Sequence, residues 1–331
     1  MRILLILLNF QEEYVMVQNS FYRIIVLVCM ILASYNICYA QQEFSEEQLS
    51  KGIEAFQNMN FEKAISYLSP IENALEGIEV ESKTTLSFIL GTCYHQTGNL
   101  EKALSLYKIV LKSSSMNNNI VIQLRPTILE VCTELGDEDA AIEHLAEMMC
   151  LMDNSDFRKS GFYSDYAIGI CTYYMTKKQY EKVIEYAEKG LSVIDSEDKE
   201  ERLKGVQKNT LYMFLGNANR ELEHYEQAVE NYKNALLYIS YTEQERCDAL
   251  HAIGNCYDHA NQSDSALIYM EKAEILYEQR NAPIDNARIN NSLELGVLLV
   301  RKGENIRAMD FLCNAENGYK ELGDFTSLPY V

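Results

Sequence analysis

The sequence predicts an all-α fold, a solenoid of about seven stacked helical hairpins. Two observations predict it. The 331 residues include only 4 prolines and 15 glycines, and 47% of the residues are hydrophobic, which favours long packed helices over disorder. In addition, a small residue follows a short polar turn at a nearly constant interval, as in chains built from repeated helical units.

The small residue stands near the start of the second helix of each expected hairpin. It is alanine in six hairpins and valine in one, at Ala64, Ala103, Ala141, Val183, Ala228, Ala266 and Ala308. Successive positions lie 38 to 45 residues apart. One hairpin cannot bury its apolar face alone, so the interval implies that neighbouring hairpins stack.

The stretch Leu211–Leu236 shows the unit most clearly. Small residues stand where its two helices are expected to touch, at Gly216, Ala228 and Ala235, and large ones such as Tyr232 fill the gaps. This pattern resembles the tetratricopeptide repeat (TPR), with a Leu-Gly pair in the first helix and Tyr-x-x-Ala entering the second. The resemblance implies an α-α superhelix whose concave groove is lined by the first helices.

The other hairpins keep this pattern to different degrees. Leu90-Gly91, Ile253-Gly254 and Leu295-Gly296 repeat the pair before the turn. Leu129 replaces the glycine in the third hairpin, and Cys171 replaces it in the fourth. We therefore expect the TPR-like solenoid to span residues 41–322. Residues 323–331 then form the start of a truncated further repeat, or a tail.

The amino-terminal segment predicts export. An apolar run, Ile24–Ala33, follows Arg23 and precedes Cys38-Tyr39-Ala40, which has small residues at the two positions that a signal peptidase reads. We expect residues 1–40 to be a signal peptide that is cleaved after Ala40. The acidic residues before this run are unusual in a signal peptide, so Met16 is a candidate for the true start. The alternative is an uncleaved membrane anchor.

The net charge limits the classes of partner that the protein is expected to bind. The formal net charge is −20, from 49 acidic and 29 basic residues. Such a surface repels phosphates, which disfavours nucleic-acid binding by this region. Two interpretations of the charge remain: it maintains solubility, or it attracts a basic protein or peptide partner.

No catalytic motif or cofactor site emerges from the sequence, so we expect no enzyme activity, cofactor or metal. Spacings of three and four residues place a polar stripe on one face of the expected helix, at Asp248, His251, Asn255 and His259. His251 and His259 are eight residues apart, about 12 Å along a helix. One zinc ion cannot bind both side chains at ligand distances near 2 Å. The cysteines outside the export segment are expected to be small packing residues.

The candidate binding residues come from the TPR resemblance. In that family, the residue after the glycine often is an asparagine that hydrogen bonds a bound peptide backbone. Asn217 and Asn255 hold that position here, and the expected groove set is Asn217, Arg220, His251, Asn255 and Asp258. An amide both donates and accepts, which suits an extended peptide. The competing interpretation is an ordinary solvated helix face.

The expected function is a non-catalytic protein- or peptide-binding scaffold, exported across the inner membrane and periplasmic. The alternative is a sensory ectodomain, or a truncated remnant of one, of a membrane-bound transcriptional regulator, because the layout also resembles such regulators. We expect contact with a membrane only if the signal segment is uncleaved or the chain is truncated.

Overall fold

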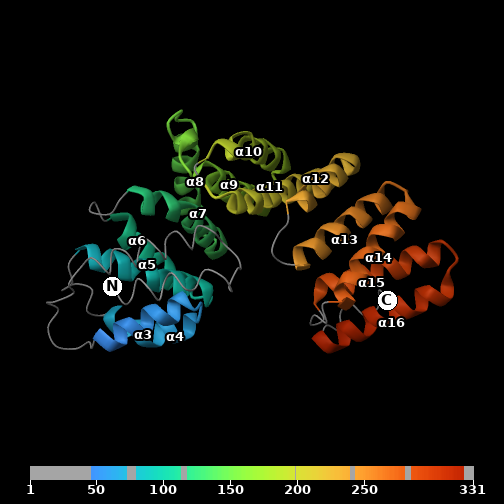
Figure 1. The fold of residues 1–331 in the computed structure, drawn as a ribbon, viewed down its shortest axis with the longest axis horizontal. Coiled ribbons are helices and arrows are strands. Elements are labelled where there is room, and N and C mark those ends of the chain that lie inside the picture. The colour runs from blue at the N-terminus through green and yellow to red at the C-terminus, as the bar shows by residue number, and fades with distance from the viewer. Residues whose placement is uncertain are drawn as a thin grey trace. The chain divides into compact units, whose positions relative to one another are not determined.

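The computed structural model describes residues 46–72, 80–112, 118–197, 199–238, 243–279 and 285–323. The predicted signal peptide with its cleavage site after Ala40, the candidate start at Met16 and the tail after Gly323 lie outside these residues. Fourteen α-helices and two short 3-10 helices, and no strand, form the described part (Figure 1). None of the described helices is long and apolar enough to cross a membrane.

The helices follow one another with short turns. In chain order they are α3 (Glu46–Gln57), α4 (Phe61–Glu72), α5 (Val80–Gln96), α6 (Leu100–Lys112), α7 (Asn118–Leu135), α8 (Glu138–Met152), α9 (Tyr163–Thr176), α10 (Tyr180–Val193), α11 (Glu201–Glu221), α12 (Tyr225–Leu237), α13 (Glu243–His259), α14 (Ser263–Gln279), α15 (Asn286–Arg301) and α16 (Asn305–Leu322).

The chain divides into two compact units, which are described separately. In the first, formed by residues 46–173 with 196 and 197, α3 packs on α4, α5 on α6 and α7 on α8. In the second, residues 174–195 and 199–323, α11 packs on α12, α13 on α14 and α15 on α16. Each of these pairs is one predicted hairpin. In the chain α9 is followed by α10 after a short turn, which completes seven consecutive helix pairs. The predicted all-α class and hairpin number are confirmed.

The small residues that mark the repeat have one structural role. Each is the fourth residue of the second helix of its hairpin, and each is at most 1% exposed. Ala228, for example, packs in a cluster with Ile253 and Cys256 of the following hairpin. A larger side chain there would push neighbouring hairpins apart, so the interval that the sequence shows is the interval at which hairpins stack.

The Leu-Gly position brings the two helices of a hairpin together. A Cβ atom added to Gly216 would lie 2.5 Å from the Tyr232 ring, and one added to Gly91 would lie 2.7 Å from the Tyr107 ring. Real Cβ atoms do not approach that closely, so the absent side chain of the glycine makes room for the tyrosine.

The turn between the helices has one backbone form in all seven described hairpins. The residue two before the second helix has a positive φ, at Met59, Gly98, Gly136, Lys178, Glu223, Asn261 and Gly303. Glycine adopts this conformation at little cost, whereas another residue costs about 1–3 kcal/mol there. Glycine occupies this position in three hairpins, and the same turn forms without glycine in the other four.

Candidate functional site

The candidate residues of α13 connect it to α15, the first helix of the next hairpin. The His251 ring nitrogen Nε2 and the Asn255 amide nitrogen Nδ2 each lie 3.0 Å from Oε2 of Glu294. A carboxylate only accepts hydrogen bonds, so both nitrogens donate to it. All three side chains are half-buried. Glu294 therefore holds His251 and Asn255 in fixed orientations.

One turn further along, Asp258 forms an ion pair with Arg301 of α15. The guanidinium contacts Oδ2 of Asp258, and the other carboxylate oxygen is buried without a hydrogen-bond partner in the described structure. Two charged or polar links thus join α13 to α15, and both start from residues that the sequence singled out.

The two candidates on α11 bond within their own hairpin. The Tyr232 hydroxyl lies 2.7 Å from Oδ1 of Asn217, and Nη2 of Arg220 lies 3.2 Å from Glu221. Arg220 also acts on α13: burial raises the pKa of the Cys256 thiol to about 11, and the charge of Arg220 opposes that rise. Arg220 is thus electrostatically coupled to the neighbouring hairpin.

Burial raises the pKa of the Glu294 carboxyl, but its contacts outweigh that effect. The hydrogen bond and charge interaction with His251, and the hydrogen bond from Asn255, together hold the pKa below the usual 4.5. Glu294 therefore stays ionised at neutral pH, which keeps it an acceptor for both neighbours.

The predicted polar stripe of α13 does not act as one surface. Asp248 accepts a hydrogen bond of 3.3 Å from Tyr277 of α14, whereas the His259 ring stacks on Tyr225 of α12 with centroids 5.5 Å apart. His251 and Asn255 share one hydrogen-bond acceptor, Glu294. No group of three or more His, Cys, Asp or Glu residues in the described ranges is placed to hold a metal ion.

Of the five predicted residues, the structure links three to α15 and leaves two on α11. The sequence analysis did not identify Glu294. This residue lies between Leu293 and the repeated Leu295-Gly296 pair. A single acidic residue among apolar ones is the only signal that marks it.

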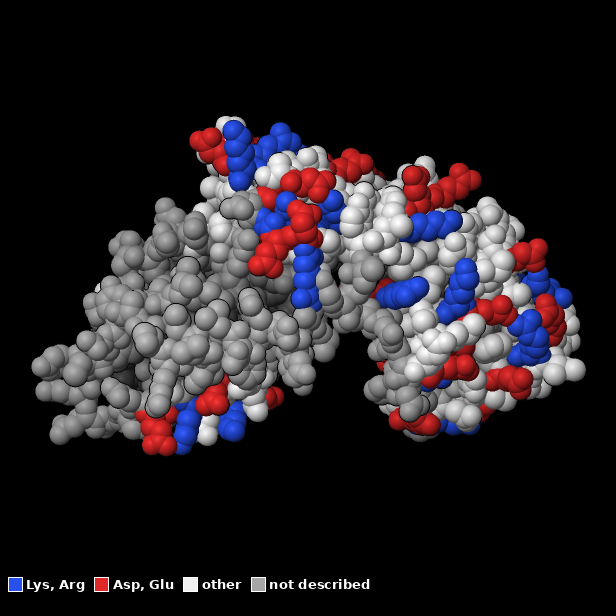
Figure 2. All heavy atoms as spheres, in the orientation of Figure 1, with Lys and Arg blue, Asp and Glu red and all other residues white. Residues whose placement is uncertain are grey.

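The outward face of α15 differs from that of α13. Val297 and Val300 are 43% and 49% exposed, although Val297 occupies the position that Asn255 holds in α13. On the face shown in Figure 2, basic side chains lie among acidic ones over this unit. That face, as far as it is described, has no broad area of one sign for a basic partner.

Comparisons with known proteins agree with the hairpin architecture. A sequence model of the tetratricopeptide repeat matches residues 210–239. No curated protein sequence matches the chain.

Many solved structures are similar, including the following three. The apo form of RapI has a TM-score of 0.63 at 14% identity, over 83% of this chain and 76% of its own. A tetratricopeptide repeat protein from Parabacteroides merdae has a TM-score of 0.55 at 16% identity, over 86% of this chain and 97% of its own. A Rap protein complexed with competence and sporulation factor has a TM-score of 0.50 at 14% identity, over 84% and 76%. The chain thus has the fold of tetratricopeptide repeat proteins, and one repeat is matched by sequence at residues 210–239.

Proposed function

We propose that the chain is a non-catalytic scaffold that binds a peptide or protein along the first helices of its fifth and sixth hairpins, α11 and α13. Stacked helical hairpins create extended concave surfaces, which repeat proteins use for binding. The binding residues are Asn217 and Arg220 on α11 and His251, Asn255 and Asp258 on α13.

The observation that carries the proposal is the orientation of Asn255. Because Glu294 can only accept, Asn255 must turn Nδ2 toward it, which leaves Oδ1 without a hydrogen-bond partner among the described residues. The amide nitrogen of Asn255 holds the side chain in place. Its half-buried Oδ1 is therefore oriented to accept a hydrogen bond from a donor such as a peptide N–H.

Asn217 has the same register in the preceding hairpin, one residue after Gly216. The Tyr232 hydroxyl fixes Oδ1, and Nδ2 bonds to no other described group. The two amides therefore present a donor on α11 and an acceptor on α13. An extended peptide carries both groups on its backbone, so it complements this pair.

One similar structure supports a peptide or protein ligand. The Rap protein in that comparison is complexed with competence and sporulation factor. Because the identity is 14%, this similarity supports the fold and a ligand of the peptide or protein class. The proposed binding residues are inferred from the present chain alone.

The test is selection of binding peptides from a random library on the purified protein, followed by affinity measurement. Asn217→Ala with Asn255→Ala removes both amides, and we expect at least tenfold weaker binding with unchanged helicity. The matched control is Asn231→Ala with Asn305→Ala, at a half-buried position of α12 and an exposed position of α16, both outside the proposed site. Equal affinity of the site double variant and the wild type would place binding elsewhere.

We further propose that the scaffold is exported and periplasmic. The support is the sequence of residues 1–40, an apolar run with a positive flank and a cleavage site. A soluble native species of roughly 33 kDa, instead of the full 38.0 kDa, is the expected result of cleavage after Ala40. A membrane-bound species of the full mass or larger would favour the sensory ectodomain of a membrane-bound regulator.

A further inference from the structure

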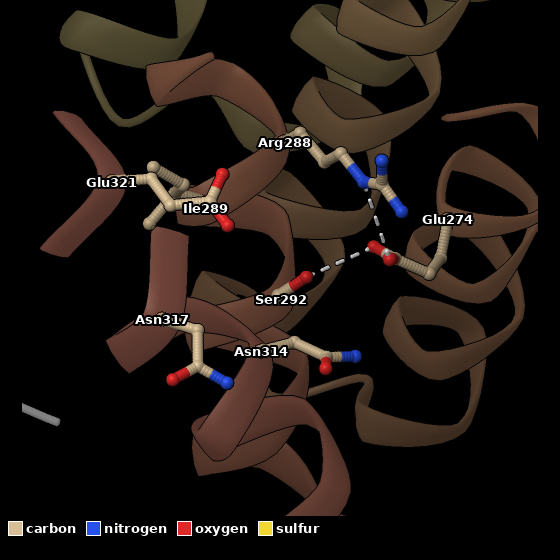
Figure 3. A pocket seen from close by; sticks show the side chains of 7 residues that line it. All are labelled: Glu274, Arg288, Ile289, Ser292, Asn314, Asn317 and Glu321. Atoms are coloured by element: carbon tan, nitrogen blue, oxygen red, sulfur yellow. Dashed lines mark hydrogen bonds and ion pairs between the residues drawn. The ribbon is translucent and has the colours of Figure 1, made fainter. Parts of the chain in front are cut away.

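A second site lies in the C-terminal unit, away from the proposed peptide-binding residues. A pocket of about 260 Å³ opens between α14, α15 and α16. Its polar lining residues are Glu274, Arg288, Ser292, Asn314, Asn317 and Glu321, and Figure 3 shows them around one space. Drug-sized ligands occupy about 300–1,000 Å³, so this pocket suits a smaller and polar molecule.

The Glu274 carboxylate forms the inner wall, although its side chain is only 5% exposed. Oε2 accepts from the Asn291 amide at 2.9 Å and from the Ser292 hydroxyl at 3.1 Å. Oε1 faces Nε of Arg288 at 3.9 Å, which is beyond hydrogen-bond distance. One oxygen is therefore satisfied by the protein, and the other keeps its acceptor capacity. A buried carboxylate in this state is costly unless a cation or donor joins it.

Arg288 supplies the opposite charge beside Glu274. It lies in the first turn of α15, where the Asp285 side chain caps its backbone N–H at 2.9 Å. Its guanidinium makes the loose pair with Glu274 and no hydrogen bond to another described side chain. The five N–H donors of a guanidinium match a carboxylate in a two-pronged geometry.

We infer that the pocket binds a free α-amino acid, with the ammonium group on Glu274 and the carboxylate on Arg288. The ammonium and carboxylate groups of the ligand are attached to the same α-carbon, and the two protein charges likewise lie close together, 3.9 Å apart. Binding requires no separation of the protein pair, because each partner uses a group that the pair leaves unbonded.

The remaining lining residues select the side chain. Asn314 and Asn317, exposed on α16, offer amides, and Glu321 adds a second carboxylate. Two acids and one base give the pocket a net charge of −1. A basic amino acid, with a net charge of +1, neutralises it, so arginine and lysine bind more tightly than neutral or acidic amino acids.

The test is isothermal titration of the purified full chain with lysine and three analogues. We expect saturable binding of lysine and at least tenfold weaker binding of cadaverine, Nα-acetyl-lysine and glutamate. Cadaverine lacks the carboxylate, and the acetylated analogue lacks the ammonium group. The absence of saturable binding at about 10 mM lysine, or equal binding of cadaverine, would overturn the inference.

Variants locate the site. Arg288→Gln and Glu274→Gln are each expected to weaken lysine binding at least tenfold. Asn317→Phe fills the pocket from an exposed helix position and is expected to abolish binding even where the buried Glu274→Gln variant folds poorly. Arg307→Gln and Asn305→Phe, also on α16, are the matched controls and leave binding unchanged.

This site is independent of the proposed peptide site. The double variant Asn217→Ala with Asn255→Ala changes no residue that lines the pocket, so we expect it to keep lysine binding. Loss of lysine binding in the Asn317→Phe variant, with peptide binding retained, would separate the two sites. Lysine binding that survives Asn317→Phe and Arg288→Gln together would contradict the assignment.

Discussion

The first helices of the last two hairpins, α13 and α15, have the same inner faces and different outer faces. Gly254 and Gly296 both lie against the second helix of their hairpin. One residue after the glycine, α13 carries the half-buried Asn255, which bonds to Glu294, where α15 carries the exposed Val297. The glycine that packs within the hairpin is therefore repeated, whereas the residue next to it, outside that contact, varies. In a solenoid of this type, hairpins differ at the variable positions, and we expect recognition of a partner at the same positions.

The largest expected effect comes from filling the glycine position. Gly254→Ala places a Cβ atom 2.6 Å from Met270 and 3.2 Å from the backbone of α14. The backbone cannot move easily, so we expect a loss of about 1–3 kcal/mol in the free energy of unfolding. Gly296→Ala meets chiefly the flexible end of Leu312, at 2.7 Å, and should cost less. Urea denaturation of the two variants measures the difference.

A cost for Gly296→Ala equal to or above that for Gly254→Ala would contradict this reasoning. Gly205→Ala in α11 is the control, because its added Cβ would meet nothing within 4 Å. There we expect a gain of about 0.5–1 kcal/mol from the higher helix propensity of alanine.

Removing Glu294 tests whether α13 and α15 are joined by their polar contacts. Glu294→Ala leaves His251 and Asn255 without their acceptor. Since its side chain is 36% exposed, water replaces part of the loss, and we expect about 1 kcal/mol of destabilisation. Glu316→Ala removes an exposed pair with Lys320 on one helix and should change stability by less than about 0.5 kcal/mol. Equal effects of the two variants would mean that the link between the hairpins contributes no stability.

The turns of these two hairpins differ in a similar way. Gly303 has φ of 80° with open space around it, whereas Asn261 adopts the same region at 58°. Gly303→Ala is therefore expected to cost about 1 kcal/mol through backbone strain alone. Asn261→Gly should change stability by at most a few tenths of that, because asparagine tolerates this conformation and glycine adds freedom to the unfolded chain. Thermal unfolding followed by circular dichroism measures both.

The smallest expected effect is a pH dependence at Glu294. Its pKa in the folded state is below the usual 4.5, so its contribution to stability is complete above about pH 4.5. That contribution is lost as the pH falls through the lower folded-state value. The stability difference between the wild type and Glu294→Gln should accordingly shrink in acid and be constant near neutral pH. A difference that grows on acidification would have the wrong sign.

The register of the fold could be predicted because one small residue per hairpin determines it. Ala228 and its equivalents recur at the stacking interval and are buried in every described hairpin. The turns could be predicted only where a glycine in the sequence indicates a positive φ, as at Gly98. At Glu223 the residue type gives no signal, since the packed helices on either side impose the conformation.

The candidate site could be predicted only in part. The helical period placed His251 and Asn255 on one stripe, and the structure brings both to one acceptor. That acceptor, Glu294, belongs to another hairpin. The relative rotation of two stacked hairpins depends on all the side chains between them, so spacing within one helix does not reveal which residue of α15 faces α13.

The non-glycine turns have a consequence for how the chain folds. A hairpin whose turn carries Met59, Lys178 or Glu223 meets an unfavourable backbone conformation before any neighbour is present to stabilise it. Such a hairpin has low stability on its own, so it depends more strongly on stabilising contacts with adjacent hairpins. We expect structure to nucleate at the glycine-turn hairpins α5–α6, α7–α8 and α15–α16 and to propagate into the others from these points.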